Sequence, residues 1–124
     1  MSTRAVVNFV DTYSPQPVAK VYRHCDGYPD GLGEDLKRFF AHVENTLVDT
    51  RFEDPSYLAA KWLVWDSMQT YNYDRENPLD FTTIGIVMET PADAQFEYDV
   101  VCTGANIPHL VCIEIGESES VLME

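Results

Sequence analysis

Alternation of apolar and polar residues predicts the strands of this chain. Five segments have a two-residue period or a run of β-branched residues: 4–11, 18–24, 81–89, 95–102 and 109–115. The connection between the first two contains two prolines and is short enough for an antiparallel hairpin. In the second strand, alternation sends Arg23 and His24 to opposite faces. The fifth segment is apolar on both faces, which is typical of a central strand.

In the middle of the chain, apolar residues recur at the three- and four-residue intervals of an α-helix. One apolar stripe contains six residues: Leu32, Leu36, Phe39, Phe40, Val43 and Leu47. We expect this first helix to begin near residues 31–33, with Asp30 as its cap.

A second helix is predicted where Asp54 and Pro55 form a typical helix start, and it covers about residues 55–70. Its seam of large side chains is Leu58, Trp62, Trp65 and Met68. The rest of its surface is also mostly apolar, which indicates either burial or a second face for a partner.

These elements give the order ββααβββ in a single α+β domain that spans residues 1–124. We predict a mostly antiparallel five-stranded sheet with the two helices packed on one face. The open face of the sheet would then display acidic residues from the last three strands. The charged segment from about residue 117 is expected to fray.

The charge distribution excludes several classes of partner. The formal net charge is −13, from 8 Lys and Arg against 21 Asp and Glu. All eight cations lie in residues 1–75, whereas residues 76–124 contain acids and no Lys or Arg. Such a chain disfavours direct nucleic-acid binding and anionic membranes. The charge is explained either by solubility or by an acidic face that meets a protein partner with a basic surface.

The three cysteines indicate a cytoplasmic protein with reduced thiols, because an odd number excludes a full disulfide framework. No apolar run approaches the roughly 20 residues of a membrane span, and the N-terminus has no signal-peptide pattern. If the last turn centres near residue 107, Cys102 and Cys112 face each other across two strands. Two buried free thiols are then favoured over a disulfide or a metal site.

The most varied chemistry lies between the second strand and the first helix, in residues 22–31 with the sequence YRHCDGYPDG. Gly27, Pro29 and Gly31 suit a rigid bend. Six side chains are the candidate ligand-binding residues: Tyr22, Arg23, His24, Asp26, Tyr28 and Asp30. The same composition is ordinary turn chemistry, so a purely structural role is the alternative.

The chain has no established catalytic motif, since it lacks a phosphate-binding glycine loop, a nucleophile elbow and a paired Cys-x-x-Cys. His24, Asp26 and Asp30 could together hold Mn²⁺ or Mg²⁺. Alternatively, His24 could act as a general base while Arg23 stabilises a developing negative charge. The pattern assigns no catalytic residue, and we expect neither a cofactor nor a bound metal.

The run Tyr22-Arg23-His24-x-Asp26-Gly27-Tyr28-Pro29, followed by Gly31 and Leu32, resembles a motif of small phage and prokaryotic proteins. The resemblance covers a short part of the chain, and Cys25 departs from it where a larger or more polar residue is expected. It implies a phage or mobile-element origin and no particular activity. Small acidic phage proteins that block host nucleic-acid machines or defence systems make an inhibitor role plausible by analogy.

Two functions follow from these patterns. The first is a non-catalytic binding or interaction module that acts on a basic host protein through an acidic sheet face or the turn. The second is a small enzyme or metal-dependent ligand-binding domain centred on Arg23, His24 and Asp26. Motif side chains that pack inward would favour the first, and a concave pocket lined by them beside the first helix would favour the second. Exposed surface on the tryptophan helix would favour a homo-oligomer.

Overall fold

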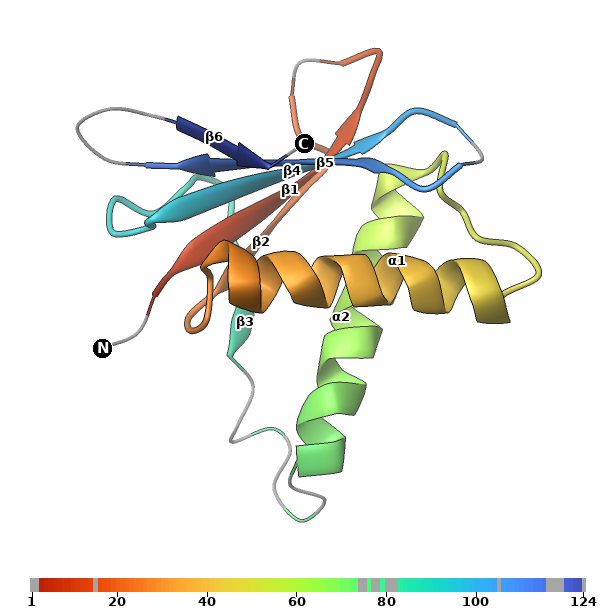
Figure 1. The fold of residues 1–124 in the computed structure, drawn as a ribbon, viewed down its shortest axis with the longest axis horizontal. Coiled ribbons are helices and arrows are strands. Elements are labelled where there is room, and N and C mark those ends of the chain that lie inside the picture. Colours follow the sequence, from red (N-terminus) through yellow and green to blue (C-terminus); the bar gives the residue numbers. More distant parts are fainter. Residues whose placement is uncertain are drawn as a thin grey trace.

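Figure 1 shows the computed structural model of the chain, in which two helices lie on the same face of a twisted sheet. The structure describes residues 3–14, 16–73, 76, 79, 83–104, 106–115 and 120–123, with the backbone alone at 71–73 and 120–123. The strands are β1 (Ala5–Asp11), β2 (Ala19–Arg23), β3 (Ile84–Ile86), β4 (Phe96–Cys102), β5 (His109–Glu114) and β6 (Ser120–Met123). The helical elements are a π-helical turn η1 (Pro29–Gly33), α1 (Glu34–Thr46) and α2 (Pro55–Tyr73). The predicted α+β class and the packing of both helices on one face are confirmed.

The strand order in the sheet is β3-β2-β1-β4-β5-β6. The hairpin of β1 and β2 forms as predicted, with Val7 opposite Val21. Among the described strands, only β1 and β4 are parallel, and Val7 lies opposite Tyr98. The connection from β3 to β4 must therefore pass β2 and β1. It does so on the side away from the helices, where Thr90 Oγ1 accepts a hydrogen bond from Lys20 Nζ at 2.9 Å.

β1 is the centre of the sheet because both of its faces are covered. Val7 and Phe9 are fully buried in the core, and Val6 on the opposite face is fully buried as well. The pattern predicts β5 as the central strand, but β5 lies two places from β1, and on its outer face Val111 and Ile113 are only half-buried. An apolar pattern on both faces thus marks a strand in the interior of the sheet without fixing its position.

The open face of the sheet carries a compact polar network rather than a row of free acids. Asn8 is buried, and its amide donates to Glu97 Oε1 at 2.6 Å and to Asp99 Oδ1 at 2.9 Å. Lys20 Nζ donates to Asn8 Oδ1 at 2.7 Å and lies 3.7 Å from Glu97 Oε1. Among the strands whose side chains the structure describes, β4 alone supplies acids to this face. The acids that β4 contributes to the expected acidic face therefore already accept hydrogen bonds from Asn8.

α1 begins after the π-helical turn rather than at a side-chain cap. The prediction of Asp30 as the cap is wrong, because no side chain accepts a hydrogen bond at the start of η1 or α1. Backbone carbonyls take that role: Gly31 N donates to Tyr28 O at 2.9 Å, and Leu32 N donates to Asp26 O at 2.7 Å. The bend therefore makes its own backbone hydrogen bonds, and Asp30 stays exposed.

α2 starts as predicted, because Asp54 Oδ1 accepts a hydrogen bond from the Ser56 amide at 3.1 Å. Along the predicted seam, Trp62 is fully buried, whereas Met68 is 54% exposed. The seam thus leaves the core as α2 proceeds, and Met68 supplies apolar surface that the described residues leave exposed.

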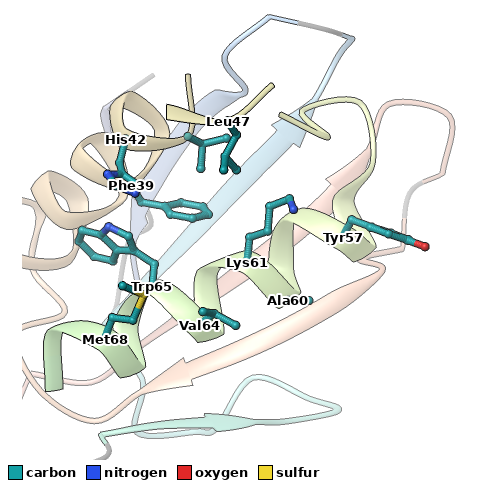
Figure 2. Close-up of a pocket in the computed structure, with 10 residues that line it drawn as sticks. Phe39, His42, Leu47, Tyr57, Ala60, Lys61, Val64, Trp65 and Met68 are labelled. Carbon is teal, nitrogen blue, oxygen red and sulfur yellow. The ribbon is translucent and has the colours of Figure 1, made fainter. Parts of the chain in front are cut away.

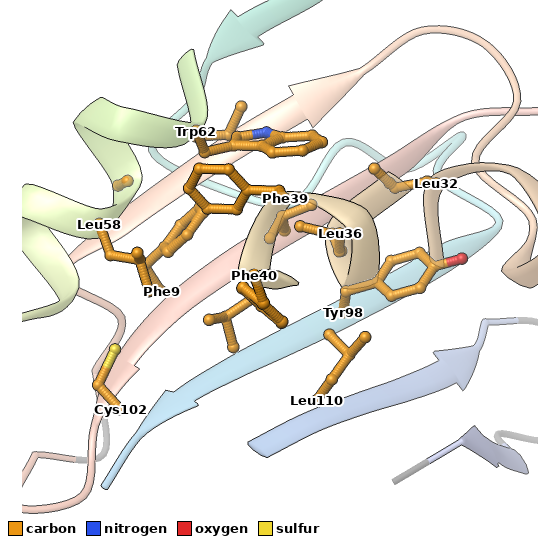
Figure 3. Close-up of a cluster of buried hydrophobic side chains, with 14 of the residues drawn as sticks. Phe9, Leu32, Leu36, Phe39, Phe40, Leu58, Trp62, Tyr98, Cys102 and Leu110 are labelled. Carbon is orange, nitrogen blue, oxygen red and sulfur yellow. The ribbon is translucent and has the colours of Figure 1, made fainter. Parts of the chain in front are cut away.

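The core lies where α1 and α2 meet β1 and β4 (Figure 3). Phe39 of α1 packs edge-on against Trp62 of α2, with ring centroids 5.4 Å apart. The other large members come from both layers: Phe9, Leu32, Leu36, Phe40, Leu58, Tyr98 and Leu110. Burying each such side chain contributes roughly 1.5–3 kcal/mol, so the packing of the two helices on this face stabilises the fold.

The C-terminal segment differs from the expectation of a frayed tail. Its described part, Ser120–Met123, forms β6 and pairs with the outer edge of β5, because that edge presents unpaired backbone groups. This makes six strands instead of five. Residues 116–119 and 124 lie outside the described residues, as do residues 81 and 82 at the start of the predicted third strand.

Cys102 and Cys112 are buried free thiols, as favoured from sequence. They are not cross-strand neighbours, because Cys112 lies opposite Tyr98 and Val100 lies opposite Leu110. The turn between β4 and β5 is thus centred earlier than residue 107. Burial raises the pKa of Cys102 to about 12, with a smaller effect from Asp11, so this thiol stays protonated.

Candidate functional site

The bend between β2 and α1 is tightly packed against β1. A Cβ atom at Gly27 would lie 2.7 Å from Ala5 Cβ and 2.9 Å from Thr3 O. A Cβ atom at Gly31 would overlap the carbonyl oxygen of Asp26. Asp26 itself has a φ of 56°, in the left-handed region that Asp and Asn tolerate better than most residues. Any residue larger than glycine would therefore clash with its neighbours at these two positions.

Three hydrogen bonds hold the bend in place. Gly27 N donates to Thr3 O at 2.9 Å, ahead of β1, and Leu32 N donates to Asp26 O at 2.7 Å. The buried hydroxyl of Tyr98 donates to Gly27 O at 2.7 Å from β4, and burial raises its pKa. The bend is thus fixed to the two central strands of the sheet.

The structure separates the six predicted site residues into three groups. Tyr22 and His24 lie on the open face, where the Tyr22 hydroxyl and His24 Nδ1 are 2.8 Å apart. Arg4 reaches His24 Nδ1 at 3.5 Å and forms an ion pair with Asp93 at 2.8 Å. The predicted divergence of Arg23 and His24 from β2 is therefore confirmed, and these two residues do not share a site.

Arg23 points toward the helices and joins them to β2. Its NH2 lies 2.8 Å from Asp35 Oδ2 of α1, and its Nε donates to Cys25 O at 3.2 Å. NH1 lies 3.9 Å from Asp66 Oδ1 of α2, which is too long for a hydrogen bond. Arg38 makes a second ion pair with Asp35. Arg23 NH1 is buried and has no hydrogen-bond partner in the described part of the chain.

Asp66 has a buried carboxyl whose pKa is shifted. It is only 7% exposed, and burial raises its pKa. The positive charge of Arg23 lowers that pKa and the negative charge of Asp35 raises it further, both more weakly than burial. A buried carboxyl beside an incompletely paired guanidinium is an arrangement found at functional sites as well as in structural ion pairs.

The third group consists of Asp26, Tyr28 and Asp30, which are exposed at the tip of the bend. The Tyr28 hydroxyl donates to Asp26 Oδ1 at 3.2 Å. The charge of Asp26 raises the pKa of Tyr28, so this phenol is a hydrogen-bond donor at neutral pH. Asp30 makes no side-chain hydrogen bond or ion pair with another described residue.

Two of the six predicted residues, Arg23 and Asp26, line a cavity of about 540 Å³ beside α1 and α2. We call it the polar cavity; its other described lining residues are Cys25, Asp35, Arg38, Trp65, Asp66, Gln69, Thr70 and Thr83. It offers guanidinium donors and carboxylate acceptors side by side. Tyr22, His24, Tyr28 and Asp30 are not among these lining residues.

The metal hypothesis needs His24, Asp26 and Asp30 to converge on one point. Within the described residues, no group of three or more His, Cys, Asp or Glu side chains is arranged to hold a metal ion. His24 instead contacts Tyr22 on the open face, while the two carboxylates lie at the tip of the bend. These three residues do not form the predicted coordination group.

A second depression lies between the two helices (Figure 2). We call it the interhelical groove; it has a volume of about 390 Å³. Its described lining residues are Phe39, His42, Val43 and Leu47 of α1 with its C-terminal end, and Tyr57, Ala60, Lys61, Val64, Trp65 and Met68 of α2. Most of these side chains are apolar, and none is acidic.

The floor of the interhelical groove is aromatic. Trp65 stacks on the buried Trp62 with ring centroids 5.5 Å apart, and it lies 5.9 Å from Phe39. The walls are apolar and open to solvent, since Val64 is 59% exposed and Met68 is 54% exposed. A rigid aromatic floor with exposed aliphatic walls is typical of a binding surface for apolar groups.

Sequence reasoning missed this groove because its residues come from two helices that are separate in the sequence. The one available indication was the apolar surface around α2, which predicts either burial or a partner. Asp35 and Asp66 were missed for a similar reason, since nothing in a single helix pattern shows that their carboxylates meet Arg23.

Among the residues that the structure describes, no helix is both long and apolar enough to cross a membrane. Neither a family model nor a curated protein nor a solved structure matches the chain.

Proposed function

We propose that this protein is a non-catalytic binding module and that the interhelical groove is its binding surface. The observation that carries this proposal is the groove itself, with an aromatic floor and exposed apolar walls on a chain of net charge −13. Pockets for small ligands typically measure about 300–1,000 Å³ and are lined mainly by apolar and aromatic side chains. At about 390 Å³, the groove falls in this range.

The internal contacts of the turn motif support a binding role over a catalytic one. Gly27 and Gly31 allow close packing, and Arg23 joins β2 to both helices through Asp35 and Asp66. These contacts account for much of the motif without any ligand. His24 as a general base and Arg23 as a charge-stabilising group would both need to contact the same substrate. They lie on opposite faces of the sheet.

The net charge would attract a basic protein over long range, but the groove has no acidic lining residue, so such a partner would bind elsewhere on the surface. The acids of the open sheet face add little to this argument, because Glu97 and Asp99 already accept hydrogen bonds from Asn8. The groove therefore supports the proposal better than the sheet face does. The resemblance of the turn to phage and prokaryotic proteins keeps an inhibitor of host machinery among the roles of such a module.

A neutral apolar dye such as Nile red tests the groove. Ala60 lines the groove and is exposed, so a tryptophan at this position should fill part of it. We expect Ala60→Trp to weaken dye binding severalfold. Ala41→Trp is the matched control, because Ala41 is also exposed and helical but does not line the groove. Equal dye binding by the two variants would show that the groove is not the binding surface.

The polar cavity supports a second candidate, a ligand-binding domain centred on the turn. The supporting observation is that Arg23 and Asp66 both line the cavity, while no hydrogen bond joins Arg23 NH1 to the Asp66 carboxyl. A thermal-shift panel of nucleosides, sugars, amino acids and divalent cations tests this candidate. A true ligand should stabilise the natural protein and lose that effect in Asp26→Asn, because Asn tolerates the positive φ of this position. A panel without any such compound would remove the candidate.

A further inference from the structure

Lys61 differs from every other described Lys or Arg of this chain. Six of these side chains lie within ion-pair distance of a carboxylate: Arg4, Lys20, Arg23, Lys37, Arg38 and Arg51. Lys61 has no ion pair or hydrogen bond from its ammonium to any residue that the structure describes. In a chain with 21 Asp and Glu, a lysine without a described carboxylate partner is a candidate for binding an external anion.

The position of Lys61 coincides with the interhelical groove. In Figure 2 its side chain extends from α2 into the space between Phe39 and Tyr57. His42 is the only other ionisable group besides the Tyr57 phenol among the described lining residues. The guanidinium carbon of Arg51 lies 4.4 Å from the centroid of the Tyr57 ring. Arg51 is not a free cation, because its Nε lies 3.0 Å from Asp49 Oδ2. The groove thus combines an apolar floor with one free positive charge.

We propose that the interhelical groove binds an amphipathic monocarboxylate of the medium-chain fatty acid class. The alkyl chain lies over Trp65, Val64 and Met68, and the carboxylate accepts a charge-assisted hydrogen bond from Lys61 Nζ. This inference rests on the proposed binding function and identifies the ligand of the same site.

Size and charge select this occupant over larger ones. A protein interface typically involves about 20–30 residues on each side, whereas the groove has ten described lining residues. An anionic bilayer would present many negative charges to a chain of net charge −13, whereas a monomeric carboxylate presents one. A single monomeric carboxylate needs one cation and a short apolar channel, and the groove supplies both.

Isothermal titration calorimetry with decanoate, decan-1-ol and decyltrimethylammonium, each below its micelle concentration, tests the inference. The three compounds share an alkyl chain and differ in the charge of the head group. We expect decanoate to bind about twofold to fivefold more tightly than decan-1-ol, as for a partly exposed ion pair. The cationic compound should bind most weakly. Octanoate and dodecanoate should bracket decanoate, with about a twofold to fourfold gain per buried methylene.

Lys61→Met removes the ammonium and keeps the length of the side chain. It should abolish the preference for decanoate over decan-1-ol. Lys37→Met is the matched control, because Lys37 is an exposed helical lysine outside the groove and pairs with Glu34. This control should retain the preference for decanoate.

The outcomes separate the inference from the function on which it rests. Equal affinity for decanoate and decan-1-ol, abolished for both by Ala60→Trp, would overturn the carboxylate assignment and leave the groove as an apolar binding site. A decanoate preference that survives in Lys61→Met would also overturn the assignment. Absence of binding by all three compounds would overturn the inference, and absence of Nile red binding as well would overturn the proposed function.

Discussion

Replacing Gly27 by alanine tests whether the bend after β2 is a structural element. The new Cβ atom would lie 2.7 Å from Ala5 Cβ and 2.9 Å from Thr3 O. Carbon atoms in contact are normally about 3.5–4.0 Å apart, so the bend or β1 must move by roughly 1 Å. Neither can move freely, because Ala5 is fully buried in the central strand and Tyr98 holds the Gly27 carbonyl.

The expected loss of stability follows from these contacts. Forcing an extra methyl group into a packed site costs about 1–3 kcal/mol. Displacement of the bend also weakens two hydrogen bonds at Gly27, to Thr3 at 2.9 Å and from Tyr98 at 2.7 Å. Each contributes about 0.5–1.5 kcal/mol. We therefore expect Gly27→Ala to lower the free energy of unfolding by about 2–4 kcal/mol.

Gly85→Ala is the matched control in β3, because a Cβ atom there meets nothing within 4 Å. This substitution reduces the conformational freedom of the unfolded chain and should raise the free energy of unfolding by about 0.4–1 kcal/mol. Urea denaturation followed by tryptophan fluorescence measures both variants. At a slope of about 1–3 kcal/mol per molar urea, the two midpoints should differ by at least about 1 M. Equal midpoints would refute the claim that space at Gly27 fixes the bend.

Three further predictions concern buried polar groups. Tyr98→Phe removes the donor to Gly27 O and should cost about 1–3 kcal/mol in urea denaturation; a loss below the error of the method would argue against this anchor. Burial raises the pKa of Asp66 above its unfolded value, so its favourable contribution is fully present only at low pH and is lost as pH rises through the folded pKa. The stability of Asp66→Asn relative to the natural protein should therefore increase as the pH rises above about 4, the pKa of an unfolded Asp, and a constant difference would contradict the shift. Because Cys102 has its pKa raised to about 12, a thiol reagent at mild alkaline pH should modify the half-buried Cys25 first and reach Cys102 only after denaturation.

Local pattern predicted the elements of this fold well because each depends on neighbouring residues. The two-residue period located β1 and β4, and Asp54 with Pro55 located the start of α2. The parallel pairing of β1 and β4 was not predictable in the same way, since residues 5 and 96 are far apart in the sequence. Asp30 failed as a cap because the backbone carbonyls of Tyr28 and Asp26 accept the Gly31 and Leu32 amides, a contact that the helix pattern does not show.

The candidate site was predicted only in part. Alternation along β2 correctly separated Arg23 from His24, because the direction of a strand side chain depends on position alone. The partners of Arg23, Asp35 and Asp66, come from two helices whose rotation about their axes is set by packing. No single segment of sequence carries that information.

The contrast between Arg23 and Lys61 explains why the groove, rather than the motif, is the better candidate for recognition. Arg23 is nearly buried and holds three elements together, so a ligand that engaged it would have to compete with Asp35 at 2.8 Å. A ligand at Lys61 displaces no described ion pair, and it covers apolar surface that is already exposed. Binding at the groove therefore gains apolar burial and a charge interaction without a compensating loss inside the fold. On this reasoning, substitutions in the bend should act mainly on folding stability, and substitutions in the groove should act mainly on binding.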